Sequence, residues 1–335
     1  MAITNYGDVT SRIGMYAAVK MLKHAEPILV LEKFAQPRPM PQNKGLVIKF
    51  RKPTPFAVST TALTEGVRPS SQQMTYSDRT ATLYQYGAWV ELTDVIADTH
   101  EDPVLNDTSM LCGEQAAETR EILNWNIITG GTNATMASAV ANRAAVTSPI
   151  SLNDVRSVVR KLRLARAKPV TKILSGSVDV GTKPVDGGYI AFGHTDIEAD
   201  LRALASFTPV AEYGSRQPLC DQESGSLENI RFVLSPLFSS VINAGGAKGS
   251  GATERVSQAG TSCDVYRTIV VGAEAWGTVP LKGKESIVPM VLNPGTPRGG
   301  DELGQRGSVA WKTWHTGLIL NEAWMNRIES AVTKL

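Results

Sequence analysis

The chain has 335 residues, of which 42% are hydrophobic, so it can bury a large core in two or three subdomains, and disorder across the whole chain is excluded. Its 34 Lys and Arg residues nearly balance 32 Asp and Glu residues, so the net charge of +2 gives no global argument for a nucleic-acid or membrane partner. The three cysteines are widely spaced and form no CxxC pair, which argues against a disulfide framework or a zinc knuckle. No signal peptide and no apolar run long enough to span a membrane is present, so we expect a soluble protein made in the cytoplasm.

A proline-rich segment, residues 35–43 (AQPRPMPQN), follows an amphipathic helix predicted over residues 12–25. It has three prolines in nine residues, which predicts an extended, polyproline-like chain rather than part of a core. Such a segment is either an arm that reaches toward another body or a linker between two domains of one chain. Composition alone favours neither.

Two β-strands are predicted next, over residues 45–52 and over the unusually long stretch 75–92. The segment between them is polar, rich in Thr, Ser and Pro, and has no helical period. We therefore predict a long hairpin whose loose tip projects from the rest of the molecule. A two-stranded ribbon is marginally stable in water and prone to edge-to-edge association, so we expect a neighbouring subunit to cover it.

The longest predicted helix covers residues 102–129 and would form a rod of about 40 Å along the edge of an elongated body. Asp102 is suited to cap it, Pro103 suits its first position, and Gly130 or Gly131 can end it in a left-handed conformation. A break near Gly113 is the alternative. Helical spacing predicts an apolar side made of Leu111, Gln115, Glu118, Ile122 and Trp125, widened by Val104, Leu105, Cys112, Leu123 and Ile128.

A second helix is predicted to begin at Ser151, with Asp154 completing a capping box. Its apolar stripe consists of Leu152, Val155, Val158, Val159 and Leu162. The other face carries hardly any acid and a block of bases: Arg156, Arg160, Lys161, Arg163, Arg166 and Lys168. This block fits a polyanion, and the alternative is a solvated face paired with acids from elsewhere in the fold. No aromatic residue interleaves it, so it is not a base-stacking surface.

The rest of the chain is predicted to form one compact domain and a returning segment. Residues 170–292 alternate short apolar runs with helical pieces, a pattern typical of α+β or α/β structure. Residues 308–332 are rich in aromatic and β-branched residues. We expect them to supply strands that pack beside the long helix, anchored by Trp311, Trp314 and Trp324.

No motif indicates catalysis, a cofactor or a metal site. The stretch GGAKGSG at residues 245–251 lacks the GK[ST] order of a phosphate-binding loop and is predicted to be a flexible surface loop. The histidines His24, His100, His194 and His315 are far apart without metal-binding spacing, so each is predicted to be structural. What remains is an arm, a ribbon, a rod and a compact domain, which together describe a protein that contacts copies of itself.

Residues 63–133 carry a resemblance to a known family. Their sequence, LTEGVRPSSQQMTYSDRTATLYQYGAWVELTDVIADTHEDPVLNDTSMLCGEQAAETREILNWNIITGGTN, is similar to the major capsid proteins of tailed bacteriophages, specifically the family typified by the capsid protein of coliphage N-four. The segments MLKHAEPILVLEKFAQ and LILNEAWMNRIESA resemble the same family, whereas the middle of the chain resembles it only in the order of its elements.

The resemblance implies an α+β fold of the Hong Kong 97-type phage capsid class. Its expected parts are an N-terminal arm (1–43), an extended β-hairpin loop (44–92), a peripheral domain (93–169) with a spine helix (102–129), an axial domain (170–292) and a return to the peripheral domain (293–335). Some members of the wider fold instead form encapsulin-like compartments that hold a cargo enzyme. That reading, and a cytoplasmic α/β enzyme with a site assembled from distant residues, are the two alternatives.

The resemblance further implies a major capsid protein that forms pentamers and hexamers in an icosahedral shell around double-stranded DNA. Assembly in the host cytoplasm with a scaffolding protein, a portal and a decoration protein would follow, without a membrane, a cofactor or enzymatic activity. The residues predicted to contact neighbouring subunits are Pro37, Pro39, Pro41, Phe50, Arg51, Glu65, Arg68, Tyr84 and Tyr86. Arg156, Arg160 and Arg163 are predicted to face the DNA.

Overall fold

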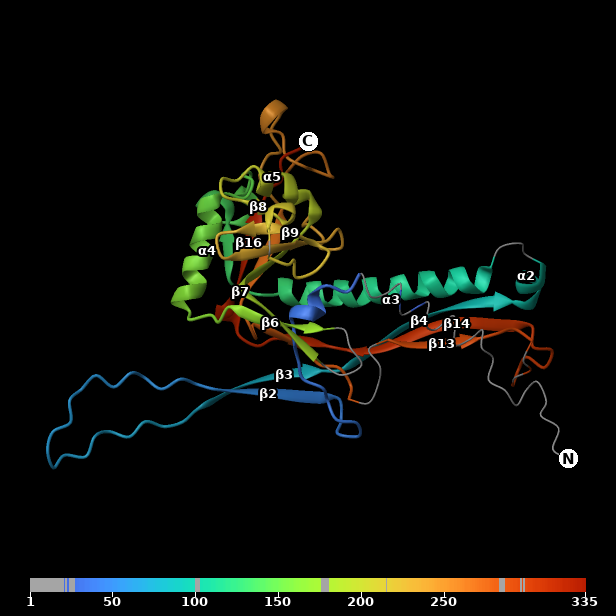
Figure 1. The fold of residues 1–335 in the computed structure, drawn as a ribbon, viewed down its shortest axis with the longest axis horizontal. Helices are drawn as coiled ribbons and strands as arrows, with labels where there is room; N and C mark the ends of the chain where they lie inside the picture. Colours follow the sequence, from blue (N-terminus) through green and yellow to red (C-terminus); the bar gives the residue numbers. More distant parts are fainter. Residues whose placement is uncertain are drawn as a thin grey trace.

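A body, a long wing and a projecting loop give the molecule an elongated shape (Figure 1). The computed structural model describes residues 21, 23, 28–99, 103–175, 181–214, 216–282, 287–295, 297 and 299–335. Helices and strands are mixed along the chain, as expected for the predicted α+β class. None of the described helices combines the length and the apolar character needed to cross a membrane.

The body is built on an eight-stranded mixed sheet with the strand order β5-β16-β11-β7-β10-β9-β8, and β6 pairs with β7 beside this path. β7 runs parallel to β10 and β16 runs parallel to β5, whereas β11 is antiparallel to both of its neighbours. Its strands are β5 (Ala134–Met136), β6 (Val170–Ser175), β7 (Gly181–Gly193), β8 (Thr208–Pro209), β9 (Glu223–Leu227), β10 (Ile230–Leu234), β11 (Tyr266–Val271) and β16 (Met325–Ser330). All five residues of β10 are buried, which shows that the centre of the sheet is covered on both faces.

The helix α4 (Leu152–Leu164) packs on one face of this sheet, together with the short helix α5 (Glu198–Arg202). As predicted, Ser151 and Asp154 form a capping box, and the stripe that includes Val155, Val158 and Leu162 is buried against the sheet. The opposite face is covered by the 3-10 helix η2 (Leu31–Phe34) and by the last turns of the long helix.

The wing consists of the long helix α3 (Val104–Thr129), the short helix α2 (Asp94–Thr99) and a three-stranded sheet. The sheet has the order β13 (Val288–Leu292), β14 (Arg306–His315) and β4 (Tyr84–Thr93), with antiparallel pairing throughout. α3 lies along one face of it (Figure 1). The prediction that the last segment packs beside the long helix is confirmed for β14, whose Trp311 donates a hydrogen bond to Gln115 Oε1 of α3 at 3.1 Å. It is wrong for β16, which lies between β5 and β11 in the body sheet.

α3 is continuous through Gly113, so the predicted single helix is confirmed and the alternative break is not. Asp102, its predicted cap, lies outside the described residues. The prediction of a left-handed glycine at its end is wrong, because Gly130 keeps a right-handed conformation with φ −69° and Gly131 does not have a positive φ either. Arg327 of β16 instead donates hydrogen bonds to the terminal carbonyls of Thr129 (2.6 Å) and Gly131 (2.9 Å), and its positive charge complements the negative end of the helix.

The predicted apolar side of α3 is also wrong in part. Leu111, Glu118 and Ile122 face solvent, with Leu111 60% exposed and Ile122 43% exposed. The buried side is built from small residues between the larger ones, and it includes Cys112, Gly113, Ala116, Ala117, Trp125 and Ile128. Small side chains let the helix approach the wing sheet and the backbone of Met21 closely, which explains why spacing of large apolar residues identified the wrong side.

The long strand predicted over residues 75–92 is divided in two at Leu83. Its first part, β3 (Tyr76–Thr82), pairs with β2 (Val47–Pro53) as the predicted hairpin. Its second part, β4, leaves the hairpin and pairs along its whole length with β14. The ribbon is therefore shorter than predicted, because β14 offers β4 a ten-residue partner that β2 is too short to provide.

A small sheet of three strands, β1 (Gln36–Pro37), β12 (Trp276–Thr278) and β15 (Gly317–Ile319), joins the root of the ribbon to the body.

The predicted flexible loop at residues 245–251 is only partly exposed. Gly245 is buried against Cys263, and Ala247 forms a β-bridge with Ser262. All three cysteines are buried and free, as expected.

Candidate interaction surfaces

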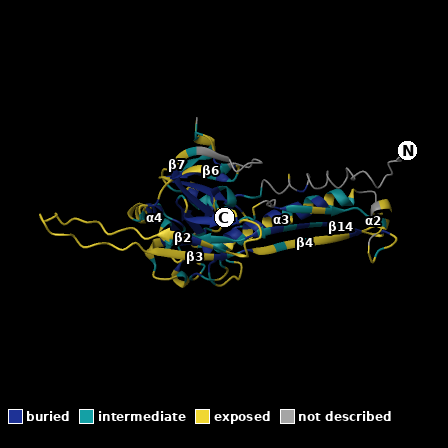
Figure 2. Cartoon of the chain, turned by 90° about the horizontal axis from the view of Figure 1, so that it is seen from below, coloured by how far each residue is buried: buried dark blue, intermediate teal, exposed yellow. Residues whose placement is uncertain are grey.

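The projecting loop, residues 54–75, extends beyond the body from the end of the β2–β3 ribbon (Figure 1). Every one of its residues is exposed, as the continuous exposed colouring of Figure 2 shows. The loop nevertheless carries large apolar side chains: Phe56, Val58, Leu63, Val67 and Met74. Its own chain offers these side chains no surface to pack on, so another molecule must cover them if they are to be buried.

An ion pair links the two strands of this ribbon close to the point where the projecting loop begins. Arg51 of β2 and Asp78 of β3 are cross-strand partners, and the guanidinium donates to both carboxylate oxygens at 2.8 and 2.9 Å. The hydrogen bonds from Arg51 lower the pKa of Asp78. Arg51, a predicted contact residue, is therefore engaged within its own chain while its side chain stays 62% exposed.

The other predicted contact residues of the ribbon and β4 occupy different environments. Phe50 is buried in its own chain against Met40 and Val279. Glu65 and Arg68 are exposed on the projecting loop, Tyr84 is exposed at the start of β4, and Tyr86 is half-buried against the wing core. Glu65, Arg68 and Tyr84 are thus the members of this group with the most surface available to a neighbour.

The proline-rich segment lies along the edge of the small sheet of its own chain. The amide of Arg38 donates to Thr278 O at 2.9 Å, and the amide of Met40 donates to Pro280 O at 2.8 Å. Pro37 is half-buried in β1, whereas Pro39 and Pro41 are exposed. The predicted extended conformation is confirmed, and the exposed prolines alternate with residues that hold the segment in place.

The face of the wing sheet that points away from α3 is largely exposed. Trp89 of β4, Ala310 of β14 and Met290 of β13 are cross-strand neighbours in one row on this face, and Trp89 is 65% exposed. β4 is also an edge strand of the described sheet. An exposed tryptophan in an apolar row beside an open strand edge is a second surface suited to a partner.

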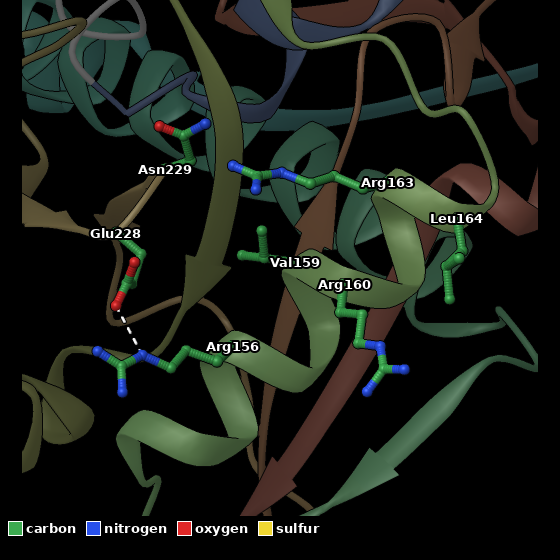
Figure 3. Close-up of a pocket in the computed structure, with 7 residues that line it drawn as sticks. All are labelled: Arg156, Val159, Arg160, Arg163, Leu164, Glu228 and Asn229. Carbon is green, nitrogen blue, oxygen red and sulfur yellow. Dashed lines mark hydrogen bonds and ion pairs between the residues drawn. The ribbon is translucent and has the colours of Figure 1, made fainter.

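The basic face of α4 borders a hollow of about 600 Å³ lined by Arg156, Val159, Arg160, Arg163, Leu164, Glu228 and Asn229 (Figure 3). Arg156 donates to Glu228 Oε1 at 2.7 Å, which is the pairing with a distant acid that the sequence left open as an alternative. Figure 3 shows Arg163 extending toward the turn that carries Asn229, while Arg160 points to the other side. Neither Arg160 nor Arg163 forms an ion pair with any residue that the structure describes.

A buried charge cluster joins the wing to the body, and sequence reasoning missed it. Arg120 of α3 pairs with Glu32 of η2 at 2.5 Å, and Glu32 lies 3.8 Å from His315 of β14. Burial lowers the pKa of His315 to about 4, so the ring is neutral at physiological pH and shares a 2.9 Å hydrogen bond with Asn124. The predicted structural role of His315 is consistent with this environment.

Glu121 is a second carboxyl group of that cluster whose pKa is shifted. Burial raises its pKa to about 8, against the opposing effect of hydrogen bonds from the amides of Leu31 (2.9 Å) and Val30 (3.3 Å). These two bonds attach η2 directly to α3.

Among the described residues, no group of three or more His, Cys, Asp or Glu side chains is arranged to hold a metal ion.

The comparisons with known proteins agree on one class of protein. The sequence profile of the family described as phage capsid protein matches residues 76–324, which is more than half of the chain. No curated protein sequence matches this chain. The structure is similar to the capsid of Ralstonia phage GP4, with a TM-score of 0.66 and 11% identity over 90% of this chain and 88% of that chain.

Two further solved structures share the fold. The capsid of the cyanophage P-SCSP1u aligns with a TM-score of 0.59 and 13% identity, covering 99% of this chain and 93% of that chain. The SrpI encapsulin complex from Synechococcus elongatus PCC 7942 aligns less well, with a TM-score of 0.51 and 9% identity, covering 100% of this chain and 98% of that chain. The fold is thus that of tailed-phage capsid proteins, and with the profile match it shows that the chain belongs to the phage capsid protein family and is a major capsid protein, a structural component of a virion.

Proposed function

We propose that this protein assembles as pentamers and hexamers into an icosahedral shell that encloses double-stranded DNA. The observation that carries the proposal is the projecting loop, whose exposed apolar side chains have no packing surface in their own chain. A contact in which the loop of one copy lies on a different surface of the next copy is heterologous, and such contacts close into rings when the rotation fits. Rings of five and six subunits are the rings from which an icosahedral shell is built.

The wing, the body and the projecting loop suggest an assignment of the domains expected for this fold. We propose that the wing with α3 is the peripheral domain and its spine helix, that the body is the axial domain, and that residues 1–43 are the arm. Since β4 pairs with β14, the extended loop would end near Leu83 rather than at residue 92. Since α4 packs on the body sheet, the axial domain would begin before α4.

The partners follow from that role. We propose assembly in the host cytoplasm, guided by a scaffolding protein, with a portal at one vertex, decoration proteins on the outside and non-specific contact with the packaged DNA. The protein would act through contacts rather than through catalysis. An encapsulin-like compartment is the second candidate, since the SrpI encapsulin shares the fold, and nucleic acid rather than a cargo protein inside purified particles would distinguish the two.

Deletion of the loop tip from Thr60 to Gln72 tests the role of the projecting loop. The shortened chain is expected to remain a folded, soluble subunit because the deleted residues make no contact with the core, but it should form no closed shells. A control variant with Ser70→Ala and Ser71→Ala in the full-length loop should assemble like wild type. Intact shells from the deletion variant, seen by electron microscopy, would contradict the proposed role.

A further inference from the structure

The solvent side of α3 combines acidic and apolar side chains in one stripe. Asp107, Leu111, Glu118 and Ile122 are all exposed, at intervals that place them on the same side of the helix. Neither Asp107 nor Glu118 forms an ion pair with a described residue. The one basic residue of α3, Arg120, is buried against Glu32 on the other side. This solvent side is therefore negatively charged and partly apolar.

The solvent side of α4 has the complementary chemistry. Arg160 and Arg163 have no acidic partner among the described residues, and Leu164 beside them is 74% exposed. The one acid of α4, Asp154, is buried in the capping box and does not neutralise them. α4 thus presents positive charge and an apolar side chain where α3 presents negative charge and apolar side chains.

The spacing of these residues matches as well. Glu118 and Ile122 are four residues apart, as are Arg160 and Leu164, so each charge lies about 6 Å from its apolar neighbour along the helix. Two helices that pack side by side can then form an arginine–glutamate pair and a leucine–isoleucine contact together. An exposed ion pair alone contributes little to the free energy of binding. A neighbouring apolar contact excludes water from the ion pair and so strengthens it.

The two helix faces cannot meet within one molecule. α4 lies on the side of the body from which the projecting loop extends, whereas α3 runs through the wing in the opposite direction, and Figures 1 and 2 agree on this arrangement. A contact between them therefore joins one copy to a different surface of the next copy. This is the same heterologous type of contact that the projecting loop requires.

We infer that α4 of one subunit docks Arg160 and Leu164 on the acidic stripe of α3 in the neighbouring subunit, with Arg163 at the border of the contact, since its side chain points to the other side of α4 (Figure 3). The inference rests on the proposed function, because it needs copies arranged in rings. It assigns α4 a protein partner instead of DNA. The exposed Leu164 favours this choice, since phosphate groups gain nothing from an aliphatic side chain, and no aromatic residue of α4 is available to stack on bases.

Charge exchange between the two helices tests the inference. R160E/R163E and D107K/E118K are each expected to reduce the yield of closed shells at least tenfold, because like charges then face each other across the interface. The four substitutions combined should restore most of the wild-type yield. K172E/K282E, which reverses two exposed lysines elsewhere in the chain, is the matched control and should assemble normally.

Thermal unfolding of the separated subunits checks that every variant is folded. The inference is overturned if the combined variant assembles as poorly as R160E/R163E. It is also overturned if R160E/R163E forms normal shells that contain less DNA, because α4 would then contact DNA. If the wild-type chain forms no shells even with its scaffolding protein, the proposed function itself is overturned. Assaying wild type beside the variants distinguishes this result from a failure of the inference alone.

Discussion

At the scale of single residues, the junction between wing and body depends on charges that are buried and paired. Burial raises the pKa of Glu32, but the charge and hydrogen bonds of Arg120 outweigh it, so the pKa lies below its usual value and Glu32 stays ionised. Glu121 is held in the protonated form by burial, and its Oε2 has no hydrogen-bond partner among the described residues. The segment around η2 is therefore attached to α3 by one ionised and one neutral carboxyl group.

This difference predicts how stability changes with pH. Between pH 4.5 and about 8 the folded subunit holds a proton on Glu121 that the unfolded chain releases, so stability falls as pH rises. The depressed pKa of His315 has the opposite effect, most of it below pH 6.5. From pH 6.5 to 8 the separated wild-type subunit should show a net loss of about 1 kcal/mol of unfolding free energy.

Glu121→Gln should abolish most of that loss, because glutamine cannot ionise and can still accept the amide hydrogen bonds of Val30 and Leu31. Glu118→Gln, on the exposed side of the same helix, should keep the wild-type pH dependence. Urea unfolding at pH 6.5 and pH 8 measures both. Equal pH dependence in wild type and Glu121→Gln would show that Glu121 is already ionised in the folded subunit.

At the scale of elements, Gly113 determines how closely α3 approaches the backbone near Met21. A Cβ atom at this position would overlap the carbonyl group of Met21. Helix propensity alone predicts that Gly113→Ala stabilises α3 by about 1 kcal/mol. The packing predicts the opposite sign, so we expect the substitution to lower the thermal unfolding midpoint of the subunit.

Asn126→Ala is the matched control, because Asn126 is an exposed position of the same helix where only propensity acts. It should leave the midpoint unchanged or raise it slightly. If Gly113→Ala raises the midpoint as well, the close approach of the Met21 backbone does not constrain α3.

Local signals in the sequence predicted some elements well. The capping box of Ser151 and Asp154 and the stripe of α4 were correct, because both depend on residues within a few positions of one another. The division of residues 75–92 at Leu83 could not be predicted, since it depends on β14, which is distant in sequence. The buried side of α3 was misassigned because small residues such as Ala116 and Ala117, rather than Leu111, make its closest packing.

The candidate surfaces show the same division between local and distant information. Exposure of Glu65 and Arg68 could be predicted from the polar composition of the loop around them. Burial of Phe50 could not, because it depends on Met40 and Val279 from separate segments. The cluster around Glu121 and His315 likewise assembles from three elements that no sequence spacing connects.

At the scale of the whole molecule, the parts of the elongated chain differ in how much of their surface is buried within the chain. The body buries its own sheet on both faces. The wing sheet leaves one face exposed, including Trp89, and has an open strand edge at β4. The projecting loop has no core at all. We therefore expect the wing and loop to gain most of their stability from neighbouring copies, and the body to be the part that is stable alone.

Electron microscopy of the purified full-length chain, with light scattering for its mass, tests self-assembly most directly. Closed polyhedral shells or tubes are expected, either from the chain alone or after co-expression with its scaffolding protein. Monomers or dimers under both conditions would contradict assembly into a shell.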